Sequence, residues 1–338
     1  MFNNIIQSKY YPIIGGSLII LFYLHYSLPL LTLAYFIIAY YVHKYQRGPI
    51  RIYNQVNLEG KIVIITGASA GIGKETAKRL AWQNATIIFA CRDELKTMKV
   101  INEIKQETGN QKLHYMNLQL DDYDNVKEFV KNFKIKFGIL DILINNAGIA
   151  QWWHKYNKNN HELVFSTNYL GHFLLTKLLL DSMSKESRII IVSSVMHELI
   201  RSKLNFNDVL NGKYLENYNN TKYCGVLFCL KLSQILKNTK VVALHPGVIK
   251  TELLDKAGNT ILLQIIQKLL FWFFRPMTLS VEEGAETTLY CALMPYRELL
   301  NGGYYEKNKL SKCSKTIQKL NQIEELWEFS NQILKEYL

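Results

Sequence analysis

Cysteine is scarce in this sequence and follows no recognisable pattern. The 338 residues contain five cysteines, which are odd in number, widely spaced and without a C-x-x-C pair: Cys91, Cys224, Cys229, Cys291 and Cys313. This distribution argues against a disulfide framework and against a zinc site. The histidines show no metal-ligand spacing either. We therefore expect reduced thiols in a cytosol-facing domain, and no bound metal.

Charge is missing from one long stretch near the amino terminus. Residues 13–42, IIGGSLIILFYLHYSLPLLTLAYFIIAYYV, contain no Asp, Glu, Lys or Arg, and about 20 apolar residues suffice to cross a bilayer. The stretch is too long for a cleaved signal peptide. We expect residues 1–46 to form a membrane anchor, with a buried core helix as the alternative. His25 and Pro29 leave open one kinked or tilted helix, or two halves that enter and return.

Basic residues orient this segment. Lys44, Arg47 and Arg51 follow it, whereas only Lys9 and the amino terminus precede it, so the positive-inside rule places the rest of the chain in the cytosol. We expect the membrane to be the endoplasmic reticulum or another endomembrane. The whole chain has 40 Lys and Arg against 28 Asp and Glu, a formal charge of +12. That charge suits membrane lipid or a phosphate-bearing cofactor. Because the lysines are scattered, we do not expect nucleic-acid binding.

After a polar linker at 47–57, apolar strand-like runs alternate with amphipathic helical stretches. Near-continuous apolar strands separated by helices predict an α/β fold, a doubly wound Rossmann-type parallel sheet with helices on both faces, over residues 58–310. Ligands of such a sheet bind where the strands end. The predicted strands are KIVIIT (61–66), ATIIFA (85–90), LHYMNL (113–118), LDILINN (140–146), RIIIVSS (188–194) and KVVALH (240–245).

A glycine cluster follows the first of these runs, in TGASAGIGKETAKRL. Glycines let the backbone turn sharply and approach a pyrophosphate, whose charge then lies at the positive end of the next helix. The order strand, glycine turn, helix predicts a dinucleotide site. We assign cofactor contacts in this turn to Gly67, Ser69, Gly71, Ile72 and Gly73.

The end of the second run bears on the choice of cofactor. An acidic residue here would hold the ribose 2′-hydroxyl of NAD, but the chain has Ala90 and Cys91, followed by Arg92. A guanidinium suits the 2′-phosphate of NADP, although an arginine after a strand can also be a solvated charge. We expect NADP(H) in preference to NAD(H).

The glycine spacing resembles the TGxxxGxG signature of the short-chain dehydrogenase/reductase family, and further motifs of that family follow in order. They are NNAG at 145–148, STNYLGHFLLT at 166–176, VSSV at 192–195, Tyr218-x-x-x-Lys222 and HPGVIKTEL at 245–253. The resemblance covers roughly residues 58–310. Within the family, ACRD, NYLGHFLLT, HPGVIKTEL and LWEFS look like the membrane-associated retinol dehydrogenase group, whose members interconvert hydrophobic alcohols and carbonyls.

The stretch YLENYNNTKYCG contains three tyrosines, and only Tyr218 has a lysine four residues later. On a helix this spacing puts the phenol and Lys222 on one face, where the cation is expected to lower the pKa of the phenol. The resemblance implies that Tyr218 transfers the proton, that Ser194 binds the substrate oxygen, and that Asn168 supports a water relay to the lysine. For Asn168 the alternative is a helix-interior side chain that bonds to backbone.

The resemblance also implies cofactor contacts beyond the glycine turn. Lys222 would bind the nicotinamide ribose beside Tyr218, and Thr251 would reach the carboxamide. Relatives carry an Asp-Leu pair near the adenine where this chain has Gln119-Leu120; Gln still accepts a hydrogen bond from an adenine amino group, so we expect altered affinity rather than its loss. The remaining contacts are assigned to Asn146, Ala147, Gly148 and Val248.

An apolar insertion near 253–280 includes ILLQIIQKLLFWFFRPM, whose apolar face is broader than a simple core stripe. We expect a lid over a lipophilic pocket that also touches the bilayer, the alternative being a helix packed wholly on the domain. Trp152 and Trp153 could line this pocket, lie at the membrane surface or be structural. Residues 311–338 read as one terminal amphipathic helix, for packing or for self-association into a homo-oligomer.

The expected function is that of a membrane-anchored, NADP-dependent oxidoreductase acting on a lipophilic alcohol, aldehyde or ketone. A retinoid is the first expectation, then a steroid or a long-chain aldehyde. A non-catalytic cofactor-binding or interaction protein on the same fold is the alternative, against which the intact set Asn168, Ser194, Tyr218 and Lys222 argues. A nucleotide-sugar epimerase would need a larger carboxyl-terminal substrate domain.

Overall fold

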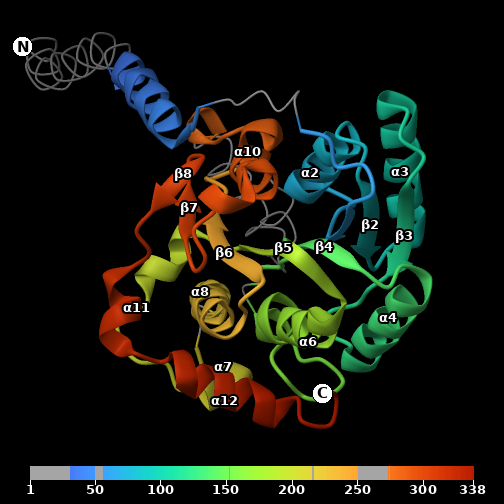
Figure 1. Ribbon diagram of the computed structural model, residues 1–338. Helices are drawn as coiled ribbons and strands as arrows, with labels where there is room; N and C mark the ends of the chain where they lie inside the picture. The colour runs from blue at the N-terminus through green and yellow to red at the C-terminus, as the bar shows by residue number, and fades with distance from the viewer. Residues whose placement is uncertain (1–30, 50–55, 152, 215–216, 250–272, 274) are drawn as a thin grey trace, which may run out of the picture.

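The computed structural model describes residues 31–49, 56–151, 153–214, 217–249, 273 and 275–338. An eight-stranded sheet in the order β3-β2-β1-β4-β5-β6-β7-β8 lies at the centre of this part of the chain (Figure 1). All neighbouring strands are parallel except β7 and β8. The strands are β1 (Ile62–Thr66), β2 (Thr86–Cys91), β3 (Leu113–Asn117), β4 (Leu140–Asn145), β5 (Met183–Val192), β6 (Thr239–His245), β7 (Tyr304–Glu306) and β8 (Lys309–Ser311).

The first six strands coincide with the six predicted apolar runs, and β5 begins earlier than expected, at Met183. Most of their side chains are buried on both faces, as in β1, where Val63, Ile64 and Ile65 have no exposed surface; the edge strand β3 is the exception, with only Leu113 buried. This burial explains why the runs are continuously apolar rather than alternating. The strand order runs from β1 outward to β3 on one side and from β4 outward to β6 on the other, so the order reverses between β1 and β4. This arrangement confirms the prediction of a doubly wound, Rossmann-type sheet.

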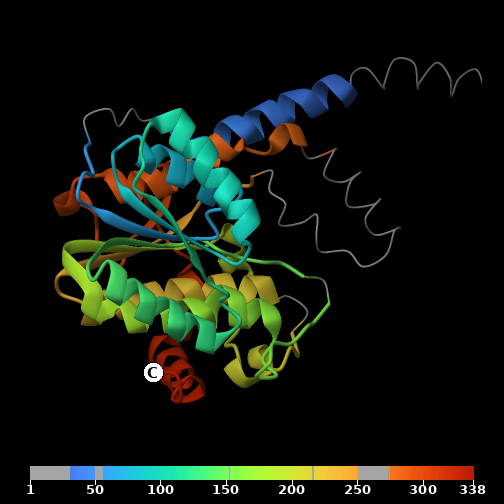
Figure 2. The same cartoon turned by 90° about the vertical axis from the view of Figure 1, so that its right-hand side faces the viewer.

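Helices cover both faces of the sheet (Figure 2). Helix α8 (Asn217–Ile235) carries apolar side chains such as Tyr223 and Leu227 into the core on one face, while α2 (Gly71–Ala81) and α10 (Val281–Leu293) cover the opposite face with Leu80 and Leu289. On the first face lie α4 (Tyr123–Lys136), α6 (Gly171–Leu179) and α8 (Asn217–Ile235), and on the second α2 (Gly71–Ala81), α3 (Glu94–Thr108) and α10 (Val281–Leu293).

The carboxyl-terminal segment forms two helices, α11 (Lys315–Leu320) and α12 (Ile323–Ile333), where one was expected. Asn321 has a left-handed backbone (φ 46°), which ends α11, because this conformation cannot continue a helix. Trp327 of α12 packs on Phe173 of α6 and Phe228 of α8, with ring centroids 5.3 and 6.4 Å away. The segment therefore covers the helical layer, while its role in self-association stays a prediction.

Residues 31–46 form a helix that projects from the domain (Figures 1 and 2). Residues 1–30 of the expected anchor, and most of the expected lid, lie outside the described residues. Among the residues that are described, the stretch long and apolar enough to cross a membrane is Leu163–Ser182, and 67% of that window is buried within the domain. That stretch is a core element of the fold.

Candidate active site

The carboxyl end of β1 carries the glycine turn. The chain leaves Thr66 through Gly67 (φ 68°) and enters α2 at Gly71 (φ 53°). A Cβ atom on Gly73 would lie 2.5 Å from the Gly67 carbonyl oxygen and 2.6 Å from Asn146 Nδ2, so only glycine fits at this position. No acidic residue occupies the first turn of α2. The turn therefore presents backbone N–H groups and a positive helix end to an anionic group, as a pyrophosphate requires.

The loop after β4 is fastened to this turn through Thr66. The Thr66 hydroxyl oxygen accepts the backbone N–H groups of Asn146 and Ala147, each at 2.9 Å, and Asn146 Nδ2 donates to the Thr66 carbonyl at 2.9 Å. A Cβ atom on Gly148 would lie 3.5 Å from Asn168 Oδ1 and 3.7 Å from Lys222 Nζ. The NNAG loop thus lies between the glycine turn on one side and the predicted catalytic residues Asn168 and Lys222 on the other.

The other predicted cofactor residues have different surroundings. Arg92 is exposed just after β2, and Gln119 is half-buried after β3. Leu120 is buried against Gly171 at the start of α6, which gives it a packing role. Val248 follows β6 and is exposed. Ser69 and Ile72 are half-buried within the glycine turn, whereas Trp152 and Thr251 lie outside the described residues.

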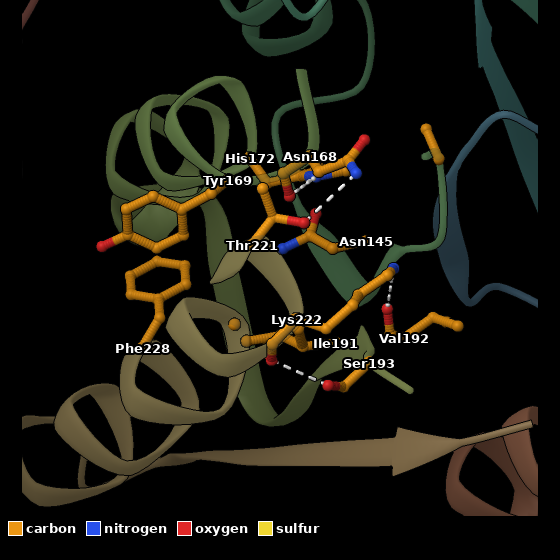
Figure 3. Close-up of a pocket in the computed structure, with 12 residues that line it drawn as sticks. Asn145, Asn168, Tyr169, His172, Ile191, Val192, Ser193, Thr221, Lys222 and Phe228 are labelled. Atoms are coloured by element: carbon orange, nitrogen blue, oxygen red, sulfur yellow. Dashed lines mark hydrogen bonds between the residues drawn. The ribbon is translucent and has the colours of Figure 1, made fainter. Parts of the chain in front are cut away.

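Tyr218 and Lys222 lie on the first turns of α8. The Lys222 ammonium is 5.4 Å from the centroid of the Tyr218 ring, so the two side chains share one helix face as their spacing predicts. Figure 3 shows Lys222 Nζ directed at the Val192 carbonyl oxygen, to which it donates at 2.8 Å. Ser194, directly after β5, hydrogen-bonds the Tyr218 phenol. Ser193 instead donates to the Lys222 carbonyl at 2.9 Å, which leaves Ser194 as the hydroxyl beside the phenol.

Burial controls the protonation of this pair. It raises the pKa of Tyr218 to about 12, against a smaller lowering by the hydrogen bond with Ser194. Burial also lowers the pKa of Lys222 to about 8. The expected net lowering of the phenol pKa is not found, because desolvation disfavours the phenolate and is the largest influence on Tyr218. At neutral pH Tyr218 is a protonated phenol, able to donate.

Asn168 lies in a π-helical turn, Ser166–Leu170, just before α6. Its Oδ1 accepts the Ile149 N–H at 2.8 Å, and its Nδ2 donates to the Ile149 carbonyl at 2.9 Å and to Thr221 Oγ1 at 3.3 Å. The side chain bonds to backbone, but to the loop after β4 rather than to its own helix. Because π-turns in helices often occur at functional sites, this geometry fits a role in linking that loop to α8.

A small cavity lies beside Lys222, with room for the centre of about one water molecule (10 Å³) (Figure 3). Asn145, Asn168, His172 and Thr221 contribute to its lining. Asn145 Oδ1 is buried and has no hydrogen-bond partner among the described residues. A polar cavity with a free acceptor is suited to hold water next to the lysine.

Sequence reasoning missed Thr66, Asn145, His172 and His197. The signal that could have found the histidines is their spacing, since His172 follows Asn168 by four residues and His197 follows Ser194 by three. Among the residues that the structure describes, no cluster of three or more His, Cys, Asp or Glu side chains could hold a metal ion.

A glycine turn suited to a phosphate group follows β1, and a half-buried phenol lies at the start of α8, at the same edge of the sheet. A dinucleotide-binding turn beside a proton donor is what a dehydrogenase or reductase that uses a nicotinamide dinucleotide needs. The family model described as short chain dehydrogenase matches residues 61–261. The chain belongs to the short-chain dehydrogenase/reductase family.

Comparison with known proteins shows which members of the family this chain resembles. Retinol dehydrogenase 12 of Homo sapiens is 36% identical over 286 residues, which cover 82% of this chain and 88% of that protein. Retinol dehydrogenase 11 of Homo sapiens is 34% identical, with 82% and 87% covered. Among solved structures, 3-ketoacyl-(acyl-carrier-protein) reductase from Brucella melitensis, complexed with NADH, is 25% identical with a TM-score of 0.56, covering 73% of this chain and 96% of that one. The protein is a short-chain oxidoreductase related to retinol dehydrogenases.

Proposed function

We propose that the protein is a membrane-anchored, NADP-dependent oxidoreductase that transfers hydride between nicotinamide and a lipophilic alcohol or carbonyl compound. The observation that carries the proposal is the meeting of the phosphate-binding turn with a catalytic quartet, defined as Asn168, Ser194, Tyr218 and Lys222. The similarity to retinol dehydrogenases 11 and 12 supports a lipophilic substrate. A retinoid is the first candidate, and a steroid or a long-chain aldehyde comes next.

The residues at the sheet edge suit a dinucleotide phosphate. Gly67, Gly71 and Gly73 keep side chains away from the pyrophosphate position, and Arg92 is exposed at the end of β2, where its guanidinium can pair with a 2′-phosphate. Arg92 is the reason to prefer NADP(H) over NAD(H). The bound nicotinamide supplies or accepts the hydride.

The quartet would handle the proton. In reduction, the Tyr218 phenol donates its proton to the oxygen of the carbonyl substrate as negative charge develops there. The Ser194 hydroxyl, already beside the phenol, donates a hydrogen bond to the same oxygen. The Lys222 ammonium, 5.4 Å from the ring, stabilises the phenolate that remains. Asn168 links the loop after β4, at Ile149, to α8, at Thr221.

The helix at residues 31–46 supports membrane anchoring. Leu31, Phe36 and Tyr41 are 65%, 54% and 63% exposed, and large apolar side chains gathered on a projecting helix favour lipid as their surroundings. Lys44 in its last turn suits the anionic cytosolic surface of a membrane. The catalytic domain would then face the cytosol from the endoplasmic reticulum or another endomembrane.

The deciding experiment compares full-length protein in lipid nanodiscs with its Tyr218→Phe variant. NADPH or NADH is offered with retinal, a steroid ketone or a long-chain aldehyde, and cofactor oxidation is followed by fluorescence. We expect turnover with NADPH that falls on the order of 10²–10⁴-fold in the variant, because the general acid is lost. Tyr296→Phe, at a tyrosine that donates to Asn238 far from the site, serves as control. NADPH binding without turnover of any carbonyl would favour the non-catalytic alternative.

A further inference from the structure

His172 joins two parts of the site that are distant in sequence. It is buried in the first turn of α6, with Nδ1 at 3.0 Å from the Asn168 carbonyl oxygen and Nε2 at 2.9 Å from the Thr66 hydroxyl. A carbonyl oxygen only accepts, so Nδ1 carries the proton. In the neutral ring, Nε2 then accepts a hydrogen bond from the Thr66 hydroxyl.

The bonds around Thr66 agree with this tautomer. Its oxygen already accepts two N–H groups, from Asn146 and Ala147, and its own hydrogen has His172 at 2.9 Å and the Ile144 carbonyl at 3.4 Å as acceptors. The shorter bond goes to the imidazole. Hydrogen bonds therefore run in one direction, from the NNAG loop through Thr66 and His172 to Asn168.

His197, which follows β5, also bonds a backbone carbonyl at Nδ1 and a hydrogen-bond donor at Nε2. It is fully buried, with Nδ1 at 2.6 Å from the Ser194 carbonyl oxygen, and its Nε2 accepts the Ser314 N–H at 3.2 Å. Because a backbone N–H only donates, Nε2 is unprotonated and Nδ1 carries the hydrogen. Ser314 precedes α11 and caps it. His197 therefore has the same tautomer as His172, protonated at Nδ1. For His172 the tautomer follows from the carbonyl at Nδ1, and for His197 it follows from the N–H donor at Nε2.

Both imidazoles are neutral at physiological pH. Burial lowers the pKa of His172 to about 4, with the charge of Lys222 acting in the same direction. Burial likewise lowers the pKa of His197. A second proton on either ring would remove the acceptor at Nε2, so the neutral state and the hydrogen-bond pattern require each other.

We propose that His172 and His197 are positioning residues for the reaction, each holding the backbone carbonyl of one member of the catalytic quartet. His172 fastens Asn168 to the cofactor loop, and His197 fastens Ser194 to the carboxyl-terminal segment. Neither ring contacts the substrate. The inference rests on the proposed function, because it assigns these residues their effect on the hydride-transfer step.

The position of Asn168 shows how such an effect is transmitted. Its amide spans Ile149 and Thr221, and Thr221 precedes Lys222. A shift of the Asn168 backbone therefore displaces Thr221 and with it Lys222, the next residue of α8. A misplacement of about 1 Å in a reacting frame can lower a rate on the order of 10²-fold.

Three substitutions at each histidine distinguish the contribution of the hydrogen bond at Nδ1 from that of the hydrogen bond at Nε2. His172→Asn retains a donor near the Nδ1 position, His172→Gln retains an acceptor near Nε2, and His172→Phe retains bulk without either; the same set applies to His197. His114→Asn, at a half-buried histidine on β3 that packs on Phe137, is the control. The measurements are the single-turnover rate of retinal reduction, the Kd for NADPH and the melting temperature.

We expect each Phe variant to lower the single-turnover rate about 10- to 100-fold while the Kd for NADPH changes by less than about threefold, a ratio worth only about 0.7 kcal/mol. Each Asn variant should recover most of the rate, and each Gln variant little of it. The inference is overturned if Asn and Phe variants are equally slow, or if only melting temperatures change.

A second measurement is independent of turnover. Imidazole ¹⁵N spectra of the full-length protein should show both His172 and His197 as neutral rings protonated at Nδ1 at pH 7, with assignments from the Asn variants. Wild-type protein that shows these tautomers but reduces no carbonyl would contradict the proposed function and leave the hydrogen-bond pattern intact. Rings protonated at Nε2, or cationic rings, would overturn the inference even in an active enzyme.

Discussion

At the scale of single residues, burial determines which proton the site can give. Tyr218 is a protonated phenol with a pKa of about 12, and Lys222 has a pKa of about 8. The phenol is thus prepared to donate, as reduction of a carbonyl requires. The Tyr-x-x-x-Lys spacing predicted the shared helix face. It could not predict the direction of the pKa shift of Tyr218, because desolvation depends on strands and loops that are remote in sequence.

The first prediction concerns the pH dependence of reduction. Below pH 8 Lys222 is an ammonium and stabilises the phenolate left by proton transfer; above it the lysine is neutral and this stabilisation is lost. We expect kcat/KM for retinal reduction to be level from pH 6 to about 7.5 and to fall toward tenfold per pH unit above about 8. A profile that stays level to pH 9.5 would show that the charge of Lys222 is not needed.

The second prediction concerns cofactor choice at Arg92. Its guanidinium is exposed at the end of β2 and would pair with the 2′-phosphate that only NADPH carries. Arg92→Gln should raise the Kd for NADPH about tenfold, equivalent to about 1.4 kcal/mol, and leave the Kd for NADH unchanged. Fluorescence titration measures both constants, with exposed Arg201→Gln as control. Equal changes for the two cofactors would remove Arg92 from the proposed site.

At the scale of elements, apolar runs predicted the first six strands because all but the edge strand β3 are largely buried on both faces. The three-residue strands β7 and β8 were missed, since so short a segment carries no periodicity. The break between α11 and α12 depends on one left-handed Asn321. The π-turn at Asn168 depends on tertiary contacts with Ile149 and Thr221, which local sequence does not contain.

The helix at residues 31–46 is attached to the domain by its last turn. Gln46 bridges two loops, since its Oε1 accepts the Val248 N–H at 3.0 Å and its Nε2 donates to the Met277 carbonyl at 2.9 Å. Arg47 pairs with Glu283 of α10 at 2.9 Å. The projecting helix therefore contacts the loop after β6, at the sheet edge where the predicted cofactor residues lie.

The third prediction tests this attachment. Gln46→Ala removes both bonds, each worth about 0.5–1.5 kcal/mol. We expect the Val248 amide to exchange with deuterium about tenfold faster, while amides in the centre of β1 are unaffected. Gln106→Ala, at an exposed position on α3, is the matched control. Unchanged exchange at Val248 would mean that Gln46 does not hold this loop.

At the scale of the whole molecule, the sheet separates two cores and brings distant segments to one edge. Thr66 at the end of β1 is linked through His172 to Asn168. Lys222 of α8 donates to Val192 of β5, two residues before Ser194. The ordered family motifs predicted that these segments would lie at one edge of the sheet, and the catalytic roles of their residues stay predictions. The bonds between those motifs were not predictable, because they depend on how strands of different sequence position pair.

The same burial that keeps histidines neutral makes the folded protein sensitive to acid. His172 and His245 have pKa values lowered by burial to about 4, whereas an unfolded histidine titrates near 6.5. Between these values the unfolded chain binds more protons than the folded one, so the free energy of unfolding decreases as the pH falls. Each histidine should contribute a loss of about 2 kcal/mol between pH 7 and pH 5.

The fourth prediction follows: urea unfolding in the presence of detergent should show about 4 kcal/mol less stability at pH 5 than at pH 7 from these two groups together. The variant His172→Asn with His245→Asn should lose this difference, because asparagine does not titrate, even if its stability at pH 7 is lower. His114→Asn, measured in parallel, should keep most of the pH dependence. Since the loss must begin below pH 6.5 and level off near pH 4, a transition above pH 7, or an unchanged slope in the double variant, would assign the acid sensitivity to other groups.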